Sequence, residues 1–379
     1  MCKDVVILLQ GETPLIAGSC EGRFEIVKYL VDMKANIEAK DDKGGTPLVR
    51  GSIGGHFEIV KYLVDMKANI EAEDEEGGTP LVWGSSEGRF EIAKYLVDMK
   101  ANIEAKDNNG ETALACCSIG GHFEIVKYLV DMKANIEAKD NNGGTPLVWG
   151  SSEGRFEIAK YLVDMKANIE AKDNNGETAL VRGSIGGHFE IVKYLVDMKA
   201  NIEAKDQYGW PPLVWGSIGG HFEIVKYLVD MKANIEAEDE EGGTPLVWGS
   251  SEGRFEIAKY LVDMKANIEA KDNNGETALV RGSIGGHFEI VKYLVDMKAN
   301  VEVKNRNGET PYHLASDDEL KIFIKHCCVE RRIQVFNRDL RDLHFLSTEL
   351  KRGLGAEVVA TNSKKRKRWE RDLSSSSSS

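Results

Sequence analysis

The sequence predicts an all-α repeat solenoid, and three observations carry this prediction. A tyrosine recurs every 33 residues from Tyr29 to Tyr293, and a fixed period in this range is the signature of a stacked repeat array. Near-identical copies of the segment HFEIVKYLVDMKANIEA at 56–72 surround these tyrosines. The segment is apolar on most of its circumference when it is drawn as a helix, so it has to be covered by neighbours.

The repeated helix is interpreted as structural. Between Phe57 and Met66 the polar residues are Glu58, Lys61 and Asp65, which are spaced by three and four and form one narrow stripe. The remaining surface is apolar and needs cover on several sides. The preceding and following copies of the same helix provide that cover.

Each unit also contains a turn and a shorter first helix. The stretch Asp41-Asp42-Lys43-Gly44 has turn chemistry, with an aspartate that can accept hydrogen bonds and a glycine suited to positive φ. Thr46 and Pro47 follow as N-cap and first residue of a helix. Gly55 ends that helix, and His56 leads into the second one.

These residues resemble ankyrin repeats. The shared patterns are D-x-x-G-x-T-P-L, G-H-x-E-I-V and A-N-I-E-A. They cover residues 13–300 as nine near-complete units, and a tenth unit that begins at Gly308 shortens into residues 317–328. The resemblance implies an array of about ten units over 13–328, each with two antiparallel helices and a β-hairpin finger. It also implies a stack that binds proteins.

Three departures from the family pattern have physical consequences. Val82 replaces a histidine that usually ties neighbouring units together, and Gly84 replaces a helical alanine. Lys67 and its eight equivalents stand where the family has glycine at the end of the second helix. If this position is left-handed, a residue other than glycine costs on the order of 1 kcal/mol or more.

The segments that flank the array have different characters. Residues 1–12 are expected to form a partial unit or cap around the apolar run Val5–Leu9. Residues 329–360 predict an amphipathic helix that packs as a cap on the last repeat, broken by Gly353-Leu354-Gly355. Residues 361–379 are basic and then serine-rich, which predicts a disordered tail.

Charge and cysteine usage bound the class of protein. Residues 1–320 carry 35 Lys+Arg against 55 Asp+Glu, whereas residues 321–379 carry 14 against 7. The acidic array therefore argues against nucleic acid along it, because phosphates would be repelled, and only the basic tail suits nucleic acid. The six cysteines fit neither a disulfide framework nor a CxxC metal motif, and no run suits a membrane span. We expect an intracellular protein, cytoplasmic or nuclear or both.

No catalytic, metal or cofactor site is predicted. The string Gly84–Gly88 matches G-x-S-x-G, but it falls in the turn between two helices and lacks the strand that a nucleophile elbow needs. The recurring histidines, His56 among them, are interpreted as helix-start residues that bond to nearby backbone, rather than as a metal ladder. Cys116 and Cys117 are interpreted as core thiols rather than a redox pair. We also expect no small-molecule substrate.

One register of the first helix attracts a functional hypothesis. Down the stack it holds Arg50, Trp83, Cys116, Trp149, Arg182, Trp215, Trp248 and Arg281. The resemblance places this register toward the concave side. Two interpretations stay open: the tryptophans fill space beside the neighbouring glycine, or a ladder of Trp and Arg, both frequent at binding hot spots, lines a groove. The finger at Tyr208 and Trp210 is the one aromatic finger tip.

The favoured function is a non-enzymatic scaffold that binds an unidentified protein through its concave groove and hairpin tips. The alternative is a nuclear, nucleic-acid-associated protein that acts through its basic C-terminal tail. The cluster Lys364, Lys365, Arg366, Lys367 and Arg368 suits a nuclear import receptor, and a solvated charge run explains it equally well.

Overall fold

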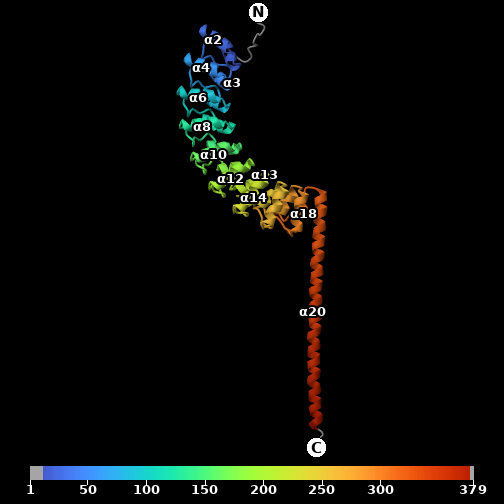
Figure 1. Ribbon diagram of the computed structural model, residues 1–379. Coiled ribbons are helices and arrows are strands. Elements are labelled where there is room, and N and C mark those ends of the chain that lie inside the picture. Colours follow the sequence, from blue (N-terminus) through green and yellow to red (C-terminus); the bar gives the residue numbers. More distant parts are fainter. Residues whose placement is uncertain (1–11, 376–379) are drawn as a thin grey trace.

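The computed structural model describes residues 12–375, and in these residues helices stack as nine antiparallel pairs followed by α19 and α20 (Figure 1). The expected N-terminal cap around Val5–Leu9 and the last serines lie outside the described residues. The first helices are α1 (Pro14–Cys20), α3 (Pro47–Gly54), α5 (Pro80–Ser86), α7 (Ala113–Gly120), α9 (Pro146–Ser152), α11 (Ala179–Ile185), α13 (Pro212–Gly219), α15 (Pro245–Ser251), α17 (Ala278–Ile284) and α19 (Pro311–Leu314). The second helices are α2 (Phe24–Asp32), α4 (Phe57–Asp65), α6 (Phe90–Asp98), α8 (Phe123–Asp131), α10 (Phe156–Asp164), α12 (Phe189–Asp197), α14 (Phe222–Asp230), α16 (Phe255–Asp263) and α18 (Phe288–Asp296). The last helix is α20 (Asp318–Ser375).

The array curves, with its two helix layers on different sides (Figure 1). Second helices such as α4, α8 and α12 lie on the outer side of the curve, and first helices such as α3 and α13 lie on the inner side. Each unit touches its neighbours and little else, as is usual in a solenoid.

The first helices begin where the sequence predicts. In α3 the Thr46 hydroxyl accepts from the Val49 N–H at 3.3 Å, and Pro47 occupies the first turn. The same threonine cap is present in α1, α5, α7, α9, α11 and α15. One otherwise unpaired N–H at each of these helix starts is thereby satisfied.

The second helices bury the apolar face that the sequence predicts. In α4 the side chains of Ile59, Val60, Leu63 and Val64 are buried. From Tyr62 onward, each repeat tyrosine packs edge-on against the phenylalanine of the preceding unit, with centroids 5.8 Å apart for Phe24 and Tyr62. Similar pairs recur along the stack, so aromatic edge-to-face contacts add to the burial between units.

Hydrogen bonds on the outer layer also join neighbouring units. The Tyr128 hydroxyl donates to Asp98 of the preceding unit at 2.9 Å. Burial, together with this hydrogen bond to a carboxylate, raises the pKa of Tyr128 to about 12. The tyrosine that marks the period is therefore also a polar connection between units.

The recurring histidines bind backbone, which confirms their interpretation as helix-start residues. His56 Nε2 donates to the Cys20 carbonyl of the preceding unit at 2.9 Å. In three other units an arginine makes the same contact, and Arg89 Nε donates to the Ile53 carbonyl at 3.1 Å. Both residue types satisfy a carbonyl at the end of a first helix. His and Arg therefore exchange freely at this position.

The β-hairpin fingers expected from the resemblance are not β-structure. In residues 12–375 no strand forms, and the only bridge is isolated, between Lys106 and Thr112. Each finger is a tight turn in which the Gly44 N–H donates to the Asp41 carbonyl at 2.9 Å. Neighbouring fingers share one backbone bond, such as the Asn141 N–H to the Asn109 carbonyl at 2.9 Å. Within the finger the Asp41 N–H also donates to the Gly45 carbonyl at 3.1 Å, and these bonds close a turn without extending into a strand ladder.

The C-terminal region also differs from expectation. The tenth second helix, the amphipathic segment and most of the expected disordered tail form the single 58-residue helix α20. The helix passes through Gly353-Leu354-Gly355 without ending. A helical glycine costs only about 1 kcal/mol, and the segment contains no proline, which would cost about 3 kcal/mol. Within the described residues, no helix is both long and apolar enough to cross a membrane.

The nine lysines that replace glycine all have left-handed backbone, with φ between 68° and 74°. They are Lys34, Lys67, Lys100, Lys133, Lys166, Lys199, Lys232, Lys265 and Lys298. An L-residue in this region crowds its Cβ against the following carbonyl oxygen. The array therefore carries the same local strain at the end of each second helix.

Changing Lys67, Lys133 and Lys199 to glycine together should raise the free energy of unfolding. The expected gain is up to about 1 kcal/mol per unit, because the relief of strain exceeds the extra unfolded-state entropy of glycine. Thermal and urea unfolding followed by circular dichroism measure it.

The matched control changes Lys61, Lys127 and Lys193 to glycine. These lysines lie in the middle of α4, α8 and α12, where glycine should lower stability by about 1 kcal/mol each. If the first triple variant melts at or below the temperature of the unchanged protein, lysine is not strained at the helix end.

Candidate functional site

The inner-face ladder is the strongest candidate for a functional surface. We use this name for the register Arg50, Trp83, Cys116, Trp149, Arg182, Trp215, Trp248 and Arg281 on the first helices α3 to α17. Cys116 is buried and the other seven side chains are half-buried. Each position therefore belongs partly to the core and partly to the surface.

An aspartate at the base of the finger holds three of the four ladder tryptophans in place, whereas the buried Nε1 of Trp83 has no hydrogen-bond partner in the described residues. Asp140 accepts from the Gly144 N–H through Oδ1 at 2.8 Å, and it accepts from Trp149 Nε1 through Oδ2 at 2.9 Å. The same contact joins Trp215 to Asp206 at 2.9 Å. Trp248 and Asp239 are joined likewise, at 2.6 Å. One carboxylate thus fixes both the finger turn and the indole.

In units with an arginine in the ladder, the arginine forms an ion pair with the aspartate at the base of its own finger. Arg182 lies 2.6 Å from Asp173 and 2.6 Å from Glu177, and Arg281 contacts Asp272 and Glu276 in the same way. Arg50 lies 2.6 Å from Asp41. Burial raises the pKa of the Asp41 carboxyl, but its hydrogen bonds from Arg50 and Gly45 outweigh this, so the pKa stays below the usual range.

Sequence reasoning missed these aspartate partners, although a signal was present. Every ladder residue from Arg50 to Arg281 follows a finger aspartate by nine residues. The residue five positions before each ladder residue also differs between units with tryptophan and units with arginine, as two examples show. Gly144 precedes Trp149, and a Cβ on Gly144 would overlap the indole. Glu177 precedes Arg182 and pairs with it.

Four ladder side chains also stack on one another. The Arg182 guanidinium lies over the Trp149 ring at 4.7 Å from its centroid, and Arg281 lies over Trp248 at 5.2 Å. Such cation–π contacts favour a planar cation over an indole face. They link adjacent units across the inner face.

The seventh finger adds a third indole to this surface. Trp210 takes the place that Gly or Glu holds in other units, and its ring centroid lies 4.5 Å from that of Trp215 and 5.5 Å from that of Trp248. We call Trp210, Trp215, Trp248 and Arg281 the aromatic cluster. Tyr208 stands at the tip of the same finger with 57% of its surface exposed.

The predicted site residues are brought together only in part. Tyr208, Trp210, Trp215, Trp248 and Arg281 gather over units seven to nine. Trp149 and Arg182 form a separate pair, whereas Arg50 and Trp83 lie toward the N-terminal end of the array, where the described residues record no stacking contact between them. The basic cluster at 364–368 is exposed on α20, far from the array (Figure 1).

One unit brings together three groups that can ligate metals. Ligand atoms of Asp107, Glu111 and Cys116 all lie within 4.8 Å of one another. Sister units place an arginine between the two carboxylates, and here Cys116 takes its place and donates to Glu111 at 3.5 Å. Burial raises the pKa of both Glu111 and Cys116. The finger geometry and this hydrogen bond account for the close approach of the three groups.

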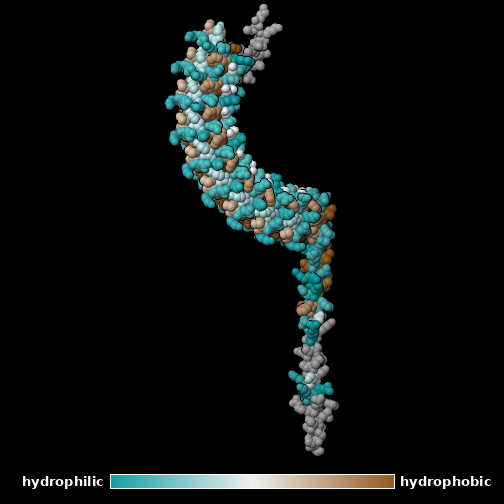
Figure 2. All heavy atoms as spheres, in the orientation of Figure 1, coloured by the Kyte–Doolittle hydropathy of each residue, from teal (hydrophilic) through white to brown (hydrophobic). Residues whose placement is uncertain are grey.

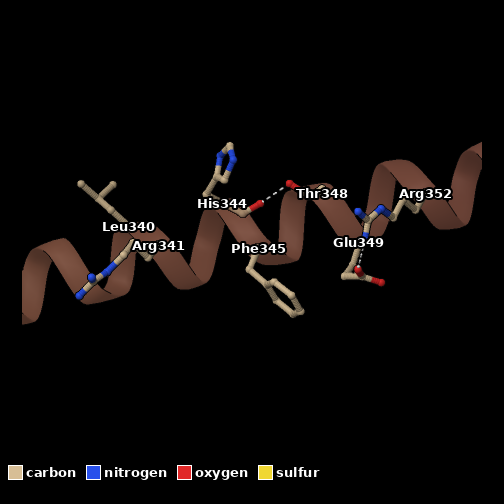
Figure 3. A pocket seen from close by; sticks show the side chains of 7 residues that line it. All are labelled: Leu340, Arg341, His344, Phe345, Thr348, Glu349 and Arg352. Atoms are coloured by element: carbon tan, nitrogen blue, oxygen red, sulfur yellow. Dashed lines mark hydrogen bonds and ion pairs between the residues drawn. The ribbon is translucent and has the colours of Figure 1, made fainter.

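In the described part of the chain, α20 lines two surface hollows. One is lined by Leu340, His344, Phe345, Thr348 and neighbouring residues of this helix alone (Figure 3). The Thr348 hydroxyl donates to the His344 carbonyl at 2.8 Å there. Another hollow of about 630 Å³ lies between the last repeat and α20. The first is an open helix face rather than a ligand cavity.

Fold and site together define a repeat protein with an extended, internally braced inner face. A family model described as ankyrin repeats in three copies matches residues 19–107, 100–173, 135–206, 165–239, 198–272 and 265–330. The chain belongs to the ankyrin-repeat family. Ankyrin repeats generally mediate interactions between proteins, and they are typically non-enzymatic. A search of curated proteins found no match to this chain.

Proposed function

We propose that this chain is a non-enzymatic scaffold that binds a partner protein along its concave face, with the aromatic cluster as the anchor. The cluster carries the proposal. It is the place in the described array where three indoles and a guanidinium meet on one surface. Trp and Arg are the residues most enriched where truncation costs most binding energy.

The cluster is ordered before any partner arrives. Asp206 holds Trp215 and Asp239 holds Trp248, so neither indole is free to rotate. A side chain that is already fixed loses less entropy on binding, and this favours affinity. The internal hydrogen bonds therefore support a binding role as well as a packing role.

The surroundings of the cluster favour a partner segment that carries basic side chains. The next finger tip contains Glu240 and Glu241, and residues 1–320 are strongly acidic overall. Complementary charge speeds encounter and selects against acidic partners. Indole faces also attract cations.

The aromatic cluster lies at a finger that differs from the repeated pattern of the array. Most units are near-identical, so they offer the same surface again and again. The seventh finger departs from this pattern at Tyr208, Trp210 and Pro211. A partner that binds at a single place on the array can distinguish this finger from the others.

Changing Trp210 and Trp248 to alanine together should remove most partner binding. Affinity capture with the full chain, followed by mass spectrometry, should give proteins that the unchanged chain retains and this variant loses. The expected loss of affinity is at least about tenfold, because hot-spot truncations cost about 2 kcal/mol or more.

The matched control changes Met231 and Met264 to alanine. These methionines follow the second helices α14 and α16 and are 41% and 44% exposed. The control should retain the same proteins. An identical captured set for all three chains, with all three folded by circular dichroism, would contradict binding through the inner face.

A second candidate is a nuclear role through the C-terminal tail. Five consecutive cations, Lys364 to Arg368, are exposed on α20. Such a run suits the acidic groove of an import receptor or the phosphates of nucleic acid.

Replacing these five cations by alanine should lower the nuclear fraction of a fluorescent fusion and leave the melting temperature of the array unchanged. An unchanged ratio of nuclear to cytoplasmic fluorescence would end the import proposal. Salt-sensitive binding of the full chain to nucleic acid, abolished by the same change, would favour the nucleic-acid alternative over the scaffold.

A further inference from the structure

The beginning of α20 uses one face to pack on the last repeat. Leu320 and Ile324 are completely buried there. Arg331 donates to the carbonyls of Lys298 and Ala299, and Arg332 Nε donates to Glu302 at 2.9 Å. After these contacts the helix leaves the array and extends into solvent (Figure 1).

A second face of α20 carries an apolar row that nothing in the described chain covers. The row is Ile322, Val329, Ile333, Phe336, Leu340, Leu343 and Leu350, each between 47% and 69% exposed. Figure 2 shows hydrophobic surface on this part of the helix among hydrophilic side chains. Exposed apolar rows of this length mark interaction surfaces.

The row and the array-facing side chains lie on opposite sides of the helix. At about 100° per residue, Ile333 and Leu340 point roughly 160–180° away from Ile324 and Arg331. Val329, nearer the array, borders the hollow between α20 and the last repeat. The array therefore leaves the row uncovered beyond Val329. Capping the last repeat, the role expected from the sequence, explains one face of α20 and leaves this one without a partner.

The spacing of the row is that of a coiled-coil seam. Successive members are separated by seven, four, three, four, three and seven residues, so they occupy the d positions of five heptads and the a positions of two, with His326 and Ser347 at the other a positions between them. The flanking e and g positions hold Lys325, Glu330, Arg332, Asn337, Asp339 and His344, with Phe323 and Leu346 as the apolar exceptions. A narrow stripe with polar flanks suits one facing helix better than a broad bundle.

We infer that α20 pairs with α20 of a second copy of this chain as a parallel two-stranded coiled coil. In the parallel arrangement each member of the row meets itself, so Phe336 faces Phe336 of the partner subunit. Asp339 at a g position then lies beside His344 of the partner subunit, a complementary contact. A helix held by this seam no longer stands alone in water, where an isolated helix is marginal.

The position of the array permits this pairing. Because each array docks on the side of α20 opposite the row, the two arrays lie on the outer sides of the coiled coil. They are related by a two-fold axis along the seam, which is a closed arrangement. The inference goes beyond the proposed binding surface and does not depend on it. It would also give a partner two inner faces at once.

The test measures the molar mass of the full chain in solution, by light scattering after size exclusion over a wide range of concentrations. The unchanged chain should reach twice its 42.0 kDa mass. A variant with Phe336→Glu and Leu343→Glu should remain at 42.0 kDa with its array intact.

The matched control carries Val335→Glu and Phe345→Glu. These side chains are 44% and 65% exposed, but they lie off the row. The control should dimerise as the unchanged chain does. A monomer at every concentration, an assembly larger than a dimer, or equal loss of dimer in both variants would overturn the inference.

Orientation is tested separately with Leu350→Cys and a mild oxidant. The parallel seam brings position 350 next to its counterpart, so mass spectrometry should find a disulfide that joins the two copies at this position. Arg352→Cys, off the seam, should give none. A dimer in which Leu350→Cys gives no such disulfide would overturn the parallel arrangement.

Discussion

The geometry of the inner face depends on the carboxylate at the base of each finger. In Asp140 one oxygen accepts from the turn backbone and the other from the indole of Trp149. In Asp173 the second oxygen is bound to Arg182 instead. This arrangement allows Trp and Arg to alternate along the ladder without changing the backbone. The base carboxylate therefore connects the finger, the first helix and the half-buried ladder side chain of each such unit.

The outer layer contributes stability, and the inner layer contributes a surface. Second helices bury nearly identical apolar faces and join through tyrosine, histidine and arginine contacts, and this layer tolerates a strained lysine at the end of each helix. First helices are shorter, and a glycine follows every ladder residue except Cys116; a Cβ added to Gly150 would lie in ordinary contact with Ile158, 3.5 Å away. A stack of this kind is stable through the sum of its unit interfaces. The ladder can consequently vary at little risk to the fold.

Most of the array could be predicted from the sequence, because its signals are local. The 33-residue period, the threonine caps and the apolar face of α4 each follow from neighbouring residues. The fingers are turns rather than β-hairpins because their internal backbone bonds stop at the tip, between Asp41 and Gly44 or Gly45, and turn chemistry alone does not fix how far the pairing extends. The length of α20 was missed because two glycines weigh little against an uninterrupted helical run. The Asp206–Trp215 contact was missed because it crosses from a turn to a helix, although its constant spacing was visible.

The most direct test of this account is Asp206→Asn in the full chain, with Asp42→Asn at an exposed finger position as control. Asparagine keeps one acceptor oxygen for two tasks, so the turn or the indole loses its partner. NMR should show a shifted and faster-exchanging indole N–H of Trp215 in this variant only, together with weaker partner capture. Unchanged Trp215 exchange and unchanged capture would contradict the claim that the base carboxylate organises the binding face.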